Sequence, residues 1–230
     1  MQKFANPEPV FRFLAPAFLI YAAAVFWYGK QYLKSLEKYN IWIQARSMLL
    51  LASAFGLFLV IPSDGLRGLF LILAVITIAA FQIFLGDTAE NLLLYETLII
   101  AFGLFFSLAA FMQYIPGFGP WYVMAVFAAV FLLSRSFYEL VPRQEKTKLI
   151  GSVAMGLFSS QMFWALSFLP LHFSALALLL FNFFYFCLTL NYYHLFHVLN
   201  FKKMQFHLFL IIACSVVVVL ATPWSILGQS

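Results

Sequence analysis

Residues 173–199 read FSALALLLFNFFYFCLTLNYYHLFHVL, and this stretch decides the fold. It contains no charged side chain and exceeds the ~20 residues that an α-helix needs to cross a bilayer. At about 100° per residue, its polar side chains fall on two faces of a helix. One face carries Asn182, Tyr185, Thr189 and Tyr193, and the other carries Cys187, Asn191 and His194.

The rest of this helix is a narrow apolar strip. A helix that is polar on two sides belongs inside a bundle, with its remaining side turned to lipid. We therefore expect residues 173–199 to form the central helix of the bundle. The residues expected to face lipid are Ala177, Phe181, Phe184, Leu188 and Leu195.

The composition extends this reading to the whole chain. Of its 230 residues, 65% are hydrophobic and 9% are charged, whereas soluble proteins contain about 25% charged residues. The chain is therefore predicted to be all-α, a polytopic transmembrane helical bundle that forms a single transmembrane domain. Its net charge of +5 resides in loops, where lipid headgroups explain it more simply than a nucleic-acid partner.

Eight spans are predicted from the apolar runs. Their bounds are about 11–29, 46–61, 66–85, 91–115, 120–140, 148–169, 173–199 and 206–222. The second span is short, so seven full crossings are the alternative. An even number of spans places both termini on the same side of the membrane.

Lys and Arg in the loops predict the orientation, because cytoplasmic loops carry an excess of these residues. With both termini on the outer side of an inner or plasma membrane, nine of them are cytoplasmic and three are outside. The cytoplasmic set is Lys30, Lys34, Lys38, Arg46, Arg143, Lys146, Lys148, Lys202 and Lys203, and the outer set is Lys3, Arg12 and Arg67.

Prolines end the even-numbered spans at a nearly constant interval. Pro62, Pro116, Pro170 and Pro223 are 54, 54 and 53 residues apart. One reading is four tandem αα-hairpin units. The other is that two spans and two short loops impose such a period on any chain. Nine residues before each proline lie Ser53, Ser107, Gln161 and Cys214.

Ionisable and amide side chains inside the spans are the candidate binding residues, since buried charge is costly in lipid and marks function or pairing. Arg135 is expected to pair with Glu96 across helices. The alternatives are a local pair between Arg135 and Glu139, or two side chains that extend to the headgroups. The predicted polar cluster contains Glu96, Arg135, Glu139, Gln161, Asn182, Asn191 and His194.

Enzymatic motifs are missing from the sequence. It has no Walker A run, HExxH, GxSxG or paired CxxC, and no lysine within a span for a retinal Schiff base. His194 and His197 could bind a metal with His207 or Glu139, but no strong ligand motif supports this. We therefore predict no cofactor, no metal and no catalytic residue.

The carboxyl half carries a resemblance. At residues 165–170 (ALSFLP), at Asn191-Tyr192 and at residues 222–224 (TPW) it resembles an uncharacterised family of small bacterial multi-pass membrane proteins. The resemblance covers spans five to eight and rests on the spacing of the hydrophobic segments more than on a sequence motif. It implies a multi-pass helical fold, and it implies no activity and no site residue.

Three functions are compatible with this sequence. The first is an integral membrane protein without a soluble catalytic domain, which acts as a complex subunit or organiser and binds lipid or another membrane protein. The second is a transporter of an ion, small solute or lipid along the polar cluster. The third, with the least support, is an intramembrane lipid-modifying enzyme.

Overall fold

The computed structural model describes residues 41–61, 63–84, 90–114, 119–139, 145–195 and 201–222, with Ala23 and Trp27. Within these residues every regular element is a helix, as the sequence predicts. The helices are α2 (Ile41–Val60), α3 (Asp64–Phe84), α4 (Glu90–Tyr114), α5 (Gly119–Tyr138), α6 (Glu145–Ser167), α7 (Phe173–Leu195) and α8 (Phe201–Ala221). The first predicted span, 11–29, lies outside the described residues apart from Ala23 and Trp27.

Each helix coincides with a predicted span, but α2 and α8 begin five residues earlier than predicted, at Ile41 and Phe201. Backbone hydrogen bonds continue the helix beyond the predicted span, through residues 41–45 (IWIQA) in α2 and 201–205 (FKKMQ) in α8. As a consequence, Arg46 lies inside α2 and not at its end.

Among the residues that the structure describes, five helices are long and apolar enough to cross a membrane, namely α4, α5, α6, α7 and α8. In α2 and α3 the described residues contribute two further apolar segments, Gln44–Val60 and Gly65–Ile76. These helices indicate a multi-pass membrane protein. The count of eight spans stays a prediction.

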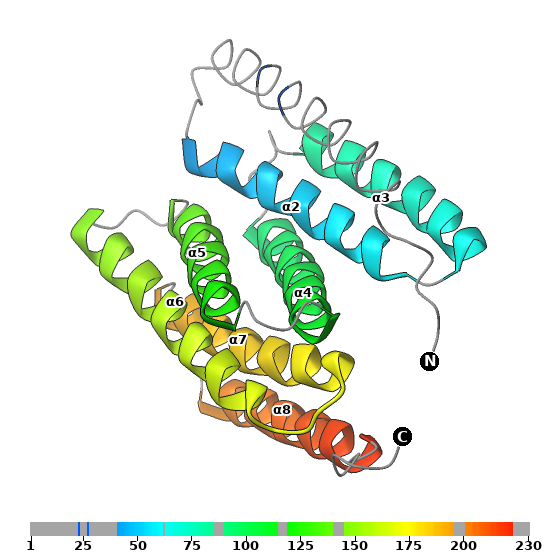
Figure 1. Ribbon diagram of the computed structural model, residues 1–230. Helices are drawn as coiled ribbons and strands as arrows, with labels where there is room; N and C mark the ends of the chain where they lie inside the picture. The colour runs from blue at the N-terminus through cyan, green and yellow to red at the C-terminus, as the bar shows by residue number, and fades with distance from the viewer. Residues whose placement is uncertain are drawn as a thin grey trace.

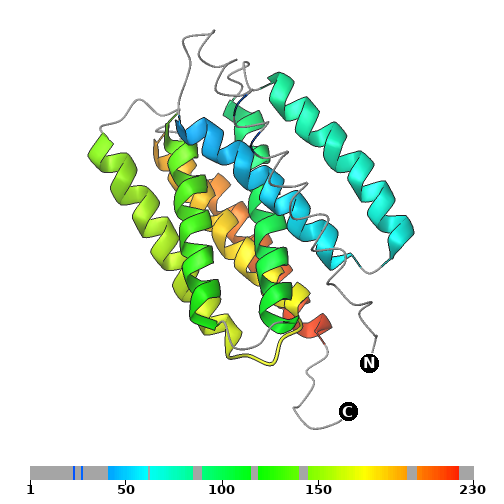
Figure 2. The ribbon, with the colours of Figure 1, turned by 45° about the horizontal axis from the view of Figure 1, so that its top comes forward.

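Figures 1 and 2 show successive helices running in opposite directions around α4. α2, α5 and α7 pack on α4, while α6 packs on α5 and α7. α3 packs on α2 and α8 packs on α7, at the two edges of the bundle. The prediction that α7 is the central helix is wrong: 56% of the membrane-length part of α4 is buried, against 39% for α7.

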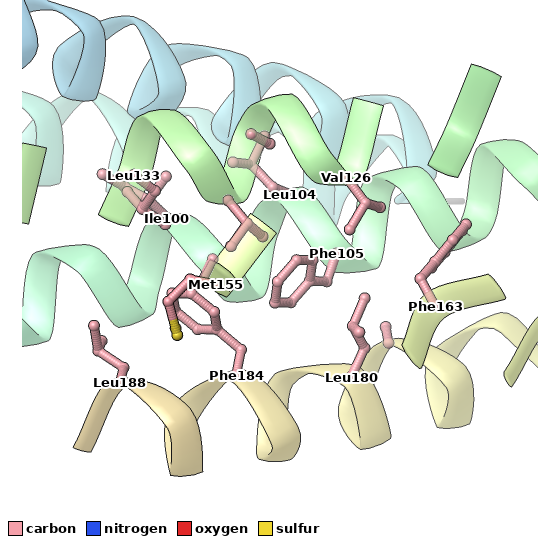
Figure 3. Close-up of a cluster of buried hydrophobic side chains, with 14 of the residues drawn as sticks. Ile100, Leu104, Phe105, Val126, Leu133, Met155, Phe163, Leu180, Phe184 and Leu188 are labelled. Atoms are coloured by element: carbon pink, nitrogen blue, oxygen red, sulfur yellow. The ribbon is translucent and has the colours of Figure 1, made fainter. Parts of the chain in front are cut away.

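The core lies between α4, α5, α6 and α7 (Figure 3). Phe105 of α4 meets Phe184 of α7 edge to face, with ring centroids 5.6 Å apart. Both rings are almost completely buried, as are the largest side chains around them. These neighbours are Ile100, Val126, Val130, Leu133, Phe137, Phe163, Leu180 and Leu188.

The apolar strip of α7 therefore faces the core and not lipid, which corrects the sequence prediction. Ala177, Phe184 and Leu188 are at most 1% exposed, and Phe181 packs edge to face on Phe102 of α4. The side chain of Leu195 is outside the described part. In a bilayer, burying apolar surface brings no hydrophobic gain, so close ring packing decides which apolar face turns inward.

α2 and α4 approach closely because each helix has a glycine and a serine at the crossing. A Cβ added to Gly56 would lie 2.6 Å from the Cβ of Ser107, and one added to Gly103 would lie 2.9 Å from the Cβ of Ser53. Both serine hydroxyls donate to carbonyls of their own helix, at 2.8 Å for Ser53 and 2.6 Å for Ser107. Small residues that satisfy their own polar groups allow such backbone contact in membrane helices.

The four positions that precede the prolines do not share one environment. Ser53 and Ser107 are buried at the α2–α4 crossing, whereas Gln161 and Cys214 are exposed on α6 and α8. The position nine residues before the proline is thus a helix contact in α2 and α4 and an exposed surface position in α6 and α8. A fourfold repeat stays a prediction.

We expect Gly56→Ala to lower stability in detergent by about 1–3 kcal/mol, because the new methyl group would overlap Ser107. Thermal or denaturant unfolding of the purified chain measures this. Gly68→Ala is the matched control, since nothing lies within 4 Å of a Cβ there and alanine favours a helix. Equal stability of the two variants would contradict the close crossing.

Candidate functional site

The alternating helix directions bring polar side chains together at one end of the bundle. This end contains the starts of α2, α4, α6 and α8 and the ends of α5 and α7 (Figure 2). We call it the charged end. Its ion-paired side chains are Arg46, Glu96, Arg135, Glu139, Glu145 and Lys148.

Arg46 of α2 and Glu96 of α4 form a buried ion pair. The Arg46 Nε lies 3.1 Å from Oε2 of Glu96, and both side chains are 5% exposed. Glu96 is six residues into its helix, roughly 9 Å along the axis. At this depth an unpaired charge is very unfavourable, so the pair holds α2 on α4.

The predicted pair between Glu96 and Arg135 is therefore wrong, because Glu96 is paired with Arg46. The sequence reading counted Arg46 as a loop residue, since it expected the second span to begin there. With α2 beginning at Ile41, Arg46 is more than a turn inside the helix and reaches α4.

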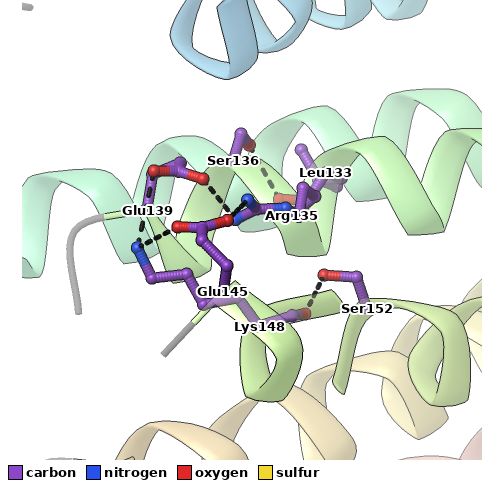
Figure 4. A network of polar contacts seen from close by, with 7 residues as sticks. All are labelled: Leu133, Arg135, Ser136, Glu139, Glu145, Lys148 and Ser152. Carbon is purple, nitrogen blue, oxygen red and sulfur yellow. Dashed lines mark hydrogen bonds and ion pairs between the residues drawn. The ribbon is translucent and has the colours of Figure 1, made fainter. Parts of the chain in front are cut away.

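Arg135 pairs with Glu139, four residues later and just past the end of α5, which confirms the local alternative (Figure 4). It also donates a hydrogen bond to Glu145 of α6. Lys148 lies 3.5 Å from Glu139 and 3.2 Å from Glu145. Two cations and two carboxylates thus neutralise one another across the α5–α6 contact.

Trp42 connects this network to α2. The Arg135 guanidinium carbon lies 4.8 Å from the Trp42 ring centroid, a cation–π distance. Arg135 is 4% exposed, so it does not extend to the headgroups. Together with the Arg46–Glu96 pair, this contact ties α2 to both α4 and α5.

The first polar face of α7 forms a hydrogen-bonded ladder with α8. The Asn182 amide donates to Ser215 at 3.2 Å. Closer to the charged end, the hydroxyls of Tyr185 and Tyr193 contact Nδ1 and Nε2 of His207 at 2.9 and 3.1 Å. This face is thus enclosed by a neighbouring helix, as the sequence predicts, although the partner His207 was considered only as a metal ligand.

The second polar face of α7 divides between two environments. The Asn191 amide donates to the Cys187 carbonyl at 2.8 Å and approaches Met155 Sδ of α6 at 3.5 Å. His194 is exposed. Gln161 lies on the outer surface of α6, away from both. Of the seven predicted residues, Arg135 and Glu139 are in direct contact, and Glu96, Asn182 and Asn191 lie at separate helix contacts. Gln161 and His194 are exposed.

No metal centre is formed by the side chains that the structure describes. Among them, no three His, Cys, Asp or Glu side chains are arranged to hold an ion. His197 lies outside the described residues. The chemistry that the described side chains of this end support is mutual charge neutralisation, because Glu96, Glu139 and Glu145 each lie against a cation.

The chain matches no protein-family model, no curated protein and no solved structure. The resemblance of the carboxyl half rests on the residues quoted above, and it transfers no site residue. The function has to be inferred from contacts and exposed surfaces.

We expect Glu96→Gln to destabilise the protein by about 3–5 kcal/mol, because it leaves the Arg46 charge buried and unpaired. A double-mutant cycle with Arg46→Met should show strong coupling in denaturant unfolding. The same cycle with Arg135→Met should be additive within experimental error. Coupling to Arg135 instead of Arg46 would refute this pairing.

Glu145→Gln is the matched control for that substitution. Its side chain is 70% exposed, so water replaces most of what the lost charge contributes. We expect little change in unfolding, and a smaller change still at high salt. A loss of unfolding free energy as large as that of Glu96→Gln would show that burial does not determine how much these ion pairs contribute to stability.

His207→Phe should weaken the α7–α8 contact, because two tyrosine hydroxyls lose their partner within an apolar helix contact. The expected loss is about 1–2 kcal/mol in unfolding experiments. His194→Phe is the control, since that side chain is exposed, and it should have little effect. Equal effects would argue against the ladder.

Proposed function

We propose that the protein is a subunit or organiser of a membrane complex, which acts by binding another membrane protein in the plane of the bilayer. It carries out no chemistry of its own in this proposal. The observation that carries it is the contrast between a neutralised, closely packed interior and broad apolar outer helix faces.

The interior supports a structural role. Arg46 with Glu96, and Arg135 with Glu139 and Glu145, are already occupied by one another. Between the helices the rings of Phe105, Phe137, Phe163 and Phe184 are at most 2% exposed, which is the close packing of a protein interior. Groups that are paired and packed in this way stabilise helix contacts and are not available to bind a solute.

The outer faces supply the binding surface. No residue in the membrane-length part of α8 is fully buried, and α3 contacts the bundle through α2. Lipid tails cover such faces by default, and a partner helix can replace them where shape or polar groups favour it. The most exposed apolar side chains on α3, α6 and α8 include Ile72, Val75, Phe158, Phe168, Phe209 and Leu220.

The transporter hypothesis needs a continuous polar path. The residues that would line it point in different directions: Asn182 to α8, Asn191 to α6, and Gln161 out of the bundle. Buried rings of Phe105, Phe184 and their neighbours lie between the helices. This arrangement favours the subunit proposal over transport, and the following experiment tests both.

Photo-crosslinking in the native membrane tests partner binding. A photoreactive amino acid at Phe209 on α8, Ile72 on α3 or Phe158 on α6 should give a discrete protein adduct from at least one face. Phe163, on α6 but buried, is the matched control and should give none. Adducts with lipid alone at all three faces would contradict the proposal.

Flux measurements test the alternative. Vesicles that contain the purified chain should dissipate proton and ion gradients no faster than protein-free vesicles. The variant that combines Arg46→Leu with Glu96→Leu should behave in the same way, since a buried pair can be replaced by apolar residues without loss of fold. Gradient-driven flux that this variant abolishes would overturn the subunit proposal.

A further inference from the structure

The outer surface of α6 carries a stripe with the spacing of a two-stranded coiled coil. Its members are separated by alternating steps of four and three residues, so they lie within about 40° of one line along the helix. We call this set the outer α6 stripe. It consists of Ile150, Ala154, Leu157, Gln161 and Trp164 of α6 and of Phe168, in the turn that directly follows the helix.

The outer α6 stripe has no partner among the described helices. Its large side chains are 45–70% exposed, with Phe168 the most exposed and Trp164 the least. The opposite side of α6 is occupied, because Gly156 lies against Phe127 of α5. The Trp164 ring packs edge to face on Phe168 at 5.2 Å, which gives one end of the stripe a fixed aromatic surface.

Gln161 is the one polar member of this stripe. It lies six residues before the end of α6 at Ser167, roughly 9 Å along the helix axis, which places it within the hydrocarbon region of a bilayer. The structure shows no hydrogen bond from its side chain to any described residue of the chain. An amide in hydrocarbon is costly unless it finds a hydrogen-bond partner, and acyl chains offer none.

We propose that a second copy of this chain binds to the outer α6 stripe and forms a twofold dimer whose Gln161 side chains pair. A carboxamide is self-complementary, because its NH₂ donates and its carbonyl accepts. Two copies inserted in the same orientation are related by an axis along the membrane normal, so their α6 helices run parallel. Residues at the same level then meet, and Gln161 meets Gln161 of the second copy.

A single polar residue in an apolar coiled-coil stripe also sets the register, because any shift leaves two amides unpaired. Ala154 and Ala165 on either side of Gln161 leave room for close approach of the two helices. This inference deepens the proposed function, because it names the partner that binds one outer face. It rests on that function in one respect, namely that this face binds protein and not only lipid.

Energy transfer between donor- and acceptor-labelled full chains in phosphatidylcholine vesicles tests the dimer. Dilution with lipid gives the dimer dissociation constant for each variant. We expect Gln161→Leu, which keeps the volume and removes the amide, to raise this constant about tenfold. Gln161→Asn should remain close to the wild type, whereas a merely space-filling role would make the leucine variant bind equally well.

Gln205→Leu is the matched control, because it changes an exposed glutamine of α8 in the same way and should leave the constant unchanged. In a Cys214→Ala background, Leu157→Cys should give a disulfide-linked dimer, and Val217→Cys on α8 should not. Absence of energy transfer, insensitivity to Gln161→Leu, or equal crosslinking at both sites would overturn the dimer. A failure of the flux or photo-crosslinking experiments would instead count against the subunit role, because they do not depend on Gln161.

Discussion

A charge that lies inside a membrane helix has to be neutralised within the protein, and this constraint organises one end of the bundle. The Arg46–Glu96 pair can form because Gly56 and Gly103 let α2 approach α4 closely. The same approach brings Trp42 over Arg135, so that α2, α4 and α5 are tied by electrostatic contacts in a region of low dielectric. The small residues thus permit the close contact of α2 and α4, and the buried ion pair fixes how the two helices are oriented in that contact.

Two kinds of contact hold the remaining helices. α4 and α7 meet through rings such as Phe105 and Phe184, where dispersion and edge-to-face geometry replace the hydrophobic effect that a bilayer does not provide. α7 and α8 meet through the ladder that ends at His207. The edge helix is thus attached by a few directional bonds, and most of its apolar surface stays available to lipid or to a partner.

These contacts give the functional proposal its logic. The charged groups of the ion pairs inside the bundle neutralise one another, whereas Gln161 faces outward without a partner in the described part of the chain. The outward amide of Gln161 in an apolar stripe favours association with another chain. The inward, neutralised Arg46–Glu96 pair stabilises the fold. The two observations are consistent with a protein that acts through its neighbours in the membrane.

The sequence by itself determined the helices, because apolar runs of bilayer length and proline stops act locally, and it identified the polar face of α7 that packs on another helix. Only the tertiary structure decided the pairs. Arg46 looked like a loop residue because its role requires α2 to start at Ile41 and to cross α4 at two glycines. The strip with Phe184 looked lipid-facing because an apolar side chain is equally compatible with lipid and with a core, and the neighbouring helix alone distinguishes them.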